Sequence, residues 1–157
     1  MEVQITNISE LSYQYTGDVS PFNNQYTARL IKPIDIEILA GDVPISFTIP
    51  VGFVTDFGTI PVACQLIVHP RGTSDRAFIV HDWLCVSQIL PQIIIDKTLQ
   101  QVMAMDGTPR TERNLAYIAV RLYDIFIRKH TKKNVKLLSN NEQILAEYFR
   151  HHPEILI

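Results

Sequence analysis

Residues 73–88 read TSDRAFIVHDWLCVSQ, and this stretch decides the fold class because the spacing of apolar residues becomes helical there. Thr73 or Ser74 is the expected N-cap of the helix, and Asp75 lies near its positive end. Apolar residues recur on nearly every side of this helix at a period of about 3.6 residues. We therefore expect a helix that is buried on most of its surface.

The residues before this helix predict β-structure. Four segments alternate polar and apolar residues or are rich in β-branched residues, and Gly, Pro, Asn and Asp separate them. The segments are EVQIT (residues 2–6), QYTARLI (25–31), IDIEIL (34–39) and ISFTIPV (45–51). We expect a β-rich part that extends from residue 1 to about residue 62.

The residues after residue 88 predict three further helices. One is IIIDKTLQQVMAMDG (93–107), stopped by Gly107. The next is TERNLAYIAVRLYDIFIRKH (111–130), with Thr111 as its cap and Pro109 just before it. The last is NNEQILAEYFRHH (140–152), which ends before a proline.

Strands first and helices after indicate an α+β fold rather than an alternating α/β fold. We expect one domain of 157 residues, in which an antiparallel β-rich half (1–62) packs against three to four helices (73–152).

The composition excludes several classes of partner. Hydrophobic residues make up 46% of the chain and the net charge is −2, so disorder and a basic nucleic-acid surface are both disfavoured. The start lacks a secretory signal pattern, and no apolar run reaches the ~18–20 residues that cross a bilayer. Cys64 and Cys85 form neither a CxxC pair nor a disulfide framework. We expect a protein of a reducing compartment, without nucleic acid and without membrane insertion.

Two ionisable residues stand in the middle of the apolar helix. Between Arg76 and Ser87, no residue other than His81 and Asp82 is charged. An unpaired carboxylate in apolar surroundings is strongly destabilising or takes up a proton. At least one of the two must therefore find a partner from elsewhere in the fold.

Other polar residues with apolar neighbours are candidate partners. Asp56 ends an apolar strand, Asp96 follows three isoleucines, and Arg121 lies within the apolar segment AVRLYDIF. The candidate cluster comprises Asp56, Thr59, His81, Asp82, Asp96 and Arg121. Trp83 is expected in the core or in the wall of a pocket.

Two hydrolytic chemistries suit such a cluster. His81 oriented by Asp56 or Asp96 would be a general base that activates water for attack on an ester, amide or phosphoester. Alternatively, His81, Asp82 and Asp56 would hold a divalent metal ion, which acidifies a bound water. A Cys85 nucleophile is less favoured, because apolar surroundings disfavour the thiolate.

Two readings without catalysis stay open. Asp56 would cap the turn that follows it, while His81 and Asp82 would clamp their helix to the rest of the fold. The other reading is a pocket for a small ligand. Its candidate binding residues are Thr59, Asp82, Trp83 and Arg121.

Four motifs occur in a fixed order along most of the chain. They are VPISFTIPVGFVTDFGTIP (residues 43–61), RGTSDRAFIVHDWLC (71–85), an acid one helix later (Asp96) and AYIAVRLYDIF (116–126). Together they resemble a family of phage and prophage proteins that is catalogued as domain of unknown function 1353. The resemblance covers roughly residues 28–127, and four ordered motifs are far more specific than one.

The resemblance assigns the candidate residues to motifs of that family. The matching residues are Gly52, Phe53, Thr55, Asp56, Phe57, Ile60 and Pro61 in the first motif, His81, Asp82, Trp83 and Leu84 in the second, Asp96 in the third, and Val120 and Arg121 in the fourth. The departures are Thr59 for a Ser, Val62 for a basic residue, Cys85 for a Tyr, and Gln92 with Ile93 for a Ser-Arg pair.

The resemblance implies a phage setting, in the host cytoplasm or in the virion, but it supplies no reaction. The favoured hypothesis is an accessory hydrolase of cell-wall or phosphoester substrates, with His81 as its base or metal ligand. A second is a virion component of the tail, neck or baseplate that binds another phage protein or forms a homo-oligomer. A third is a counter-defence protein that captures a small ligand.

Overall fold

The structure is a computed structural model of the 157-residue chain, and it describes residues 2–21, 24–57, 72–125 and 141–156. The strands are β1 (Val3–Ile8), β2 (Tyr13–Val19), β3 (Tyr26–Leu30), β4 (Ile34–Ala40), β5 (Val43–Ile49) and β6 (Val54–Thr55). The helices are α2 (Asp75–Ser87), α3 (Gln92–Met105), α4 (Arg110–Tyr123) and α6 (Asn141–His151), followed by the 3-10 turn η2 (Pro153–Leu156).

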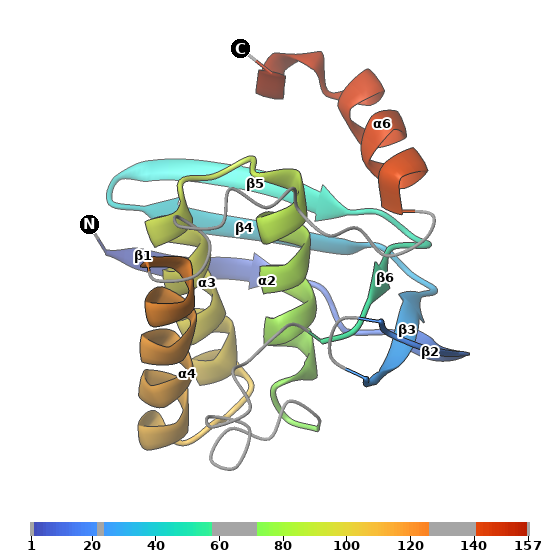
Figure 1. The fold of residues 1–157 in the computed structure, drawn as a ribbon. Helices are drawn as coiled ribbons and strands as arrows, with labels where there is room; N and C mark the ends of the chain where they lie inside the picture. The colour runs from blue at the N-terminus through green and yellow to red at the C-terminus, as the bar shows by residue number, and fades with distance from the viewer. Residues whose placement is uncertain (1, 22–23, 58–71, 126–140, 157) are drawn as a thin grey trace.

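The strands form two antiparallel sheets of three strands each (Figure 1). The order is β1-β4-β5 in one sheet and β2-β3-β6 in the other. In β4 the isoleucines at 34, 36 and 38 are buried and the acids between them are exposed, as the alternation IDIEIL predicts. The apolar face of the first sheet therefore points to a core, and the opposite face points to solvent.

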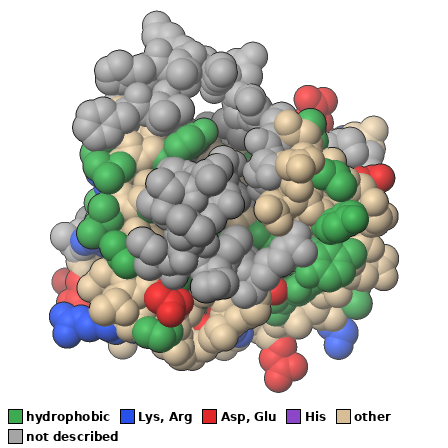
Figure 2. All heavy atoms as spheres, turned by 60° about the horizontal axis from the view of Figure 1, so that its bottom comes forward, with side chains coloured by type: hydrophobic (Ala, Val, Ile, Leu, Met, Phe, Trp, Pro, Cys, Tyr) green, Lys and Arg blue, Asp and Glu red, His purple; other side chains and the backbone are tan. Residues whose placement is uncertain are grey.

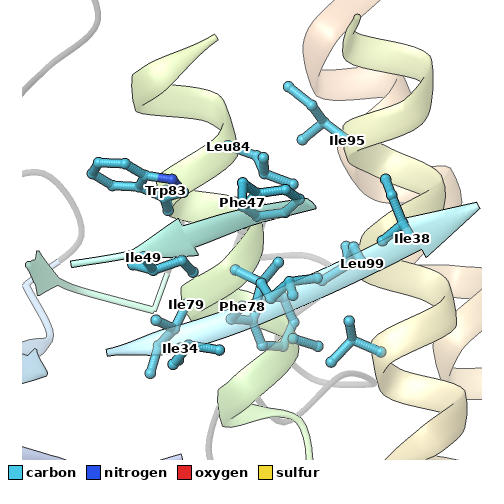
Figure 3. Close-up of a cluster of buried hydrophobic side chains, with 14 of the residues drawn as sticks. Ile34, Ile38, Phe47, Ile49, Phe78, Ile79, Trp83, Leu84, Ile95 and Leu99 are labelled. Atoms are coloured by element: carbon cyan, nitrogen blue, oxygen red, sulfur yellow. The ribbon is translucent and has the colours of Figure 1, made fainter. Parts of the chain in front are cut away.

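The core lies between the β1-β4-β5 sheet and helices α2 and α3 (Figure 3). Side chains from both layers interdigitate there, namely Ile34 and Ile38 of β4, Phe47 and Ile49 of β5, Phe78, Ile79, Trp83 and Leu84 of α2, and Ile95 and Leu99 of α3. Complete burial of one such side chain stabilises a fold by about 1.5–3 kcal/mol. This packing holds α2 and α3 side by side, which is the arrangement that the polar centre requires.

The expected α+β architecture is confirmed, with strands first and helices after. One strand, β2, was not expected from the pattern, because most of its residues are exposed and show no alternation. The apolar strand expected before Asp56 is present as β6, with only two residues. None of the described helices combines the length and the apolar character needed to span a membrane.

The expected helix ends are confirmed in part. Gly107 follows α3 with a φ of +81°, a conformation that favours glycine and stops the helix. Ser74 occupies the N-cap position of α2, but its hydroxyl makes no capping bond and lies 3.1 Å from that of Thr108. The expectation for Thr111 is wrong, because α4 begins one residue before it, directly after Pro109.

Candidate functional site

The polar centre lies where three helices pack side by side. His81 is in the middle of α2, Asp96 is in the first half of α3, and Arg121 is in the last turn of α4. Helix α3 packs against both α2 and α4 (Figure 1). A single side chain of α3 can therefore reach residues on both neighbouring helices.

The Asp96 carboxylate is the hub of this centre. Its side chain is fully buried, and Nε2 of His81 lies 3.1 Å from its Oδ1. Nε2 of Gln92 donates to the same oxygen at 2.8 Å, and Nη1 of Arg121 donates to Oδ2 at 3.1 Å. A buried carboxylate needs such partners, and those with a positive charge form the stronger bonds. Of the expected cluster, the structure brings together His81, Asp96 and Arg121.

The protonation of Asp96 follows from these contacts. Burial alone raises the pKa of Asp96, but hydrogen bonds from His81, Gln92 and Arg121 outweigh it, and the resulting pKa is lower than usual. Asp96 is therefore a carboxylate at neutral pH, and it holds three helices together through charged hydrogen bonds.

The charge of His81 is set by its neighbours. Burial lowers the pKa of His81. The Cys85 sulfur and the Asp96 carboxylate raise it by more than burial lowers it, so the resulting pKa is about 10. His81 is therefore an imidazolium at neutral pH. A general base must be neutral when it accepts a proton, so this environment suits His81 better as a proton donor.

A thiol completes the centre. Sγ of Cys85 lies 3.7 Å from Nδ1 and 3.7 Å from Nε2 of His81, one helical turn earlier on α2. Nε2 of Gln92 lies 3.7 Å from the same sulfur. The expectation of purely apolar surroundings for Cys85 is wrong. Sequence reasoning disfavoured Cys85 as a nucleophile and missed Gln92 as a site residue, although Gln92 is four positions from Asp96, the spacing that places residues on one helix face.

Asp82 belongs to a different contact. Its Oδ2 accepts a hydrogen bond of 2.5 Å from the hydroxyl of Thr55 in β6. That hydroxyl also accepts the backbone N–H of Phe57 at 2.9 Å. Phe57 is buried with a φ of +64°, an uncommon conformation for an aromatic residue. Asp82 therefore fixes the end of β6 against α2, as the reading without catalysis proposes for this residue.

Asp56 also points to another partner. Its Oδ2 accepts a hydrogen bond of 2.6 Å from the hydroxyl of Ser20, which follows β2. Among the described residues no hydrogen bond joins Asp56 to His81, so the structure does not support Asp56 as the residue that orients the imidazole. Thr59 lies outside the described residues.

Trp83 lies in the core. It is fully buried, and its ring packs edge-on against Phe53 and Tyr148 with centroids 5.3 and 5.0 Å apart. Its indole Nε1 has no hydrogen-bond partner in the described part of the chain. Among the residues that the structure describes, Trp83 therefore contributes packing and no side-chain hydrogen bond.

A metal centre was a further expectation, with His81, Asp82 and Asp56 as ligands. Within residues 2–21, 24–57, 72–125 and 141–156, no three or more His, Cys, Asp or Glu side chains are grouped so that they could hold a metal ion. The carboxylates of Asp82 and Asp56 bind hydroxyl groups instead.

The fold and the centre together define an α+β protein with a charged network across three helices. A family model described as "Protein of unknown function (DUF1353)" matches residues 34–120, which is more than half of the chain. The chain belongs to this family, and the match includes Asp56, His81, Asp82 and Asp96. No curated protein and no solved structure matches the chain.

Proposed function

We propose that the protein is a hydrolase of acyl bonds, with Cys85 as nucleophile and His81 as the residue that transfers protons. One observation carries the proposal: the Cys85 sulfur contacts the ring of His81, and that ring is bound to a buried carboxylate. A nucleophile beside a histidine that an acid orients is the arrangement of many hydrolytic sites.

The charges suit this chemistry. The nucleophilic form of a thiol is its thiolate, and a cationic imidazole beside it balances that negative charge. The thiolate of Cys85 forms a bond to the acyl carbon, and His81 donates its proton to the departing oxygen or nitrogen as the old bond breaks. Neutral His81 then takes a proton from water while the water oxygen attacks the thioester. Release of the acid restores the thiolate and the imidazolium.

Gln92 supports the same reaction. Its side-chain N–H group lies 3.7 Å from the Cys85 sulfur and is held by Asp96. An amide donor beside the nucleophile can stabilise the negative oxygen that develops on the substrate carbonyl. Cys85 and Gln92 are two positions at which the chain departs from the family pattern that it resembles, and they contact each other. We assign the proposed reaction to this chain and not to every member of the family.

The resemblance to phage and prophage proteins suggests where the reaction takes place. We propose that the protein is a phage-encoded accessory protein, present in the host cytoplasm or in the virion. Acyl bonds in that setting include the peptide bonds of the bacterial cell wall. A phosphoester substrate is less favoured, because the arrangement of a thiol, an imidazolium and an amide suits acyl transfer.

The test is acyl transfer by purified protein in a Cys64→Ser background, in which Cys85 is the only thiol. The protein with Cys85 intact should release p-nitrophenol from p-nitrophenyl acetate. Mass spectrometry should detect a transient acetyl group on the peptide that contains Cys85. Cys85→Ser and His81→Asn should each lower the rate by on the order of 100-fold or more. Folded variants that keep the full rate would refute the proposal.

A second function has its own support. Leu115, Ile118 and Leu122 form an apolar stripe on α4, with exposed fractions of 38%, 51% and 48%. Figure 2 shows hydrophobic side chains on the surface along the side where α4 lies. Such stripes are typical of protein interfaces, which favours a virion component that binds another phage protein. Co-purification with particles that Ile118→Asp abolishes would support this function, and absence from particles would count against it.

A further inference from the structure

The guanidinium of Arg121 uses only part of its hydrogen-bonding capacity. Its Nη1 donates to Oδ2 of Asp96, and this is its only hydrogen bond within the described residues. The side chain is 27% exposed, so the group is reachable from solvent. A guanidinium carries five N–H donors in one plane, and its remaining donors can form a second, two-pronged contact with an anion.

Asp96 does not occupy the whole guanidinium of Arg121. This one carboxylate is shared between His81 and Arg121, so Arg121 keeps donors for a second anion. Asp124 is three residues beyond Arg121 on the chain, but within the described part no ion pair joins the two. Asp82 and Asp56 bind hydroxyl groups elsewhere.

A relay of contacts connects Cys85 to Arg121. Gln92 contacts the Cys85 sulfur and Asp96, and Asp96 contacts Arg121, so two side chains separate the thiol from the guanidinium. A substrate that reached both would carry an anionic group in addition to its scissile carbonyl. Ile118, one turn before Arg121 and 51% exposed, offers an apolar surface beside it.

We propose that the site takes acyl substrates that carry a carboxylate close to the scissile bond, and that Arg121 binds this carboxylate. This inference rests on the proposed role of Cys85 as nucleophile. A peptide whose last peptide bond is cleaved has the required chemistry, because its terminal carboxylate lies two bonds beyond the amide nitrogen. An arginine suits this task because its planar donors match the two oxygens of a carboxylate.

The test uses two alkylating reagents that differ in charge, iodoacetate and iodoacetamide, on the Cys64→Ser protein. The measured quantity is the rate of alkylation of Cys85 by iodoacetate divided by its rate with iodoacetamide. The same quotient is measured for the uncharged small thiol N-acetylcysteinamide as a reference. A positive charge near the Cys85 sulfur should raise the quotient of the protein about fivefold above the reference. High salt should reduce the preference, because it screens partly exposed charges.

Two variants assign the effect to the guanidinium. Arg121→Gln should remove the preference for iodoacetate, while Arg121→Lys should keep most of it because the charge remains. Circular dichroism of each variant checks the fold. If Arg121→Gln fails to fold, the preference for iodoacetate is compared between the wild type and Arg121→Lys in low and high salt. A preference that does not fall in high salt would overturn the inference.

The outcomes also separate this inference from the proposed function. Iodoacetamide that reacts with Cys85 at neutral pH no faster than with the free thiol would refute the activated thiolate, and the proposed function with it. Fast reaction with iodoacetamide but no preference for iodoacetate would leave the nucleophile in place and overturn only the carboxylate-binding role of Arg121.

Discussion

Nε2 of His81 lies 3.1 Å from Oδ1 of Asp96, although 15 positions of the chain separate the two residues. The contact joins α2 to α3 and places a cation against a fully buried carboxylate. Arg121 adds a contact from α4 to the same carboxylate. Stability and chemistry are therefore linked at this point, because the groups proposed to react also hold the helices together.

The pKa of His81 predicts how stability depends on pH. Its pKa rises from 6.5 to about 10 on folding, so the folded state binds this proton more tightly than the unfolded state. The stabilisation is complete below pH 6.5 and is lost as the pH rises towards 10, with a slope of at most about 1.4 kcal/mol per pH unit. Urea unfolding across this range should show a decline in wild type that is absent in His81→Gln. Equal slopes in both proteins would contradict the assignment.

Loss of the Asp96 charge should be strongly destabilising. Asp96→Asn keeps the size of the side chain but leaves His81 and Arg121 without their common counter-charge. Removal of one partner of a buried ion pair costs about 3 kcal/mol or more. The free energy of unfolding in urea measures the effect, and Asp42→Asn, at an exposed turn, is the matched control that should change little. A neutral result for Asp96→Asn would mean that the pair is not formed.

Trp83 should tolerate loss of its indole nitrogen but not loss of its volume. Its Nε1 has no partner in the described residues, so Trp83→Phe removes no hydrogen bond and should cost about 1–2 kcal/mol. Trp83→Ala leaves a cavity between Phe53 and Tyr148 and should cost about 3–5 kcal/mol. Thermal unfolding of the two variants tests the order. A large loss in Trp83→Phe would indicate a polar role for the indole.

The hydroxyl of Thr55 should matter more than its methyl group. Thr55→Val leaves the Asp82 carboxylate and the Phe57 N–H without this partner, while Thr55→Ser keeps both contacts. We expect a loss of about 2 kcal/mol for Thr55→Val and much less for Thr55→Ser. Chemical denaturation of the two variants, compared at one pH, gives the difference. Equal losses would show that packing of the methyl group dominates.

Part of the site could be predicted from the sequence because burial demands partners. An apolar helix that contains His81 needed an acid from elsewhere, and Asp96 was among the candidates. Spacing along one helix cannot tell which acid of another part of the chain lies opposite His81, so the sequence leaves both Asp56 and Asp96 as candidates. Cys85 was misjudged because the sequence showed its apolar neighbours on α2 but not the Gln92 amide from α3.

The fold was predictable where one face of an element is buried. The pattern of β4 has this property, since every second residue is an isoleucine that packs into the core. In β2, by contrast, the residues from Gln14 onward are largely exposed, and burial places little constraint on their sequence.

The pairing of Val3 with Ala40 constrains the order in which the chain can assemble. Because β1 pairs with β4, the first strand has to wait during synthesis until its partner has left the ribosome. Closing that long loop costs entropy before any ladder of hydrogen bonds forms. The hairpin of β4 and β5 needs no such wait, because Ala40 and Val43, which pair beside its turn, are three positions apart.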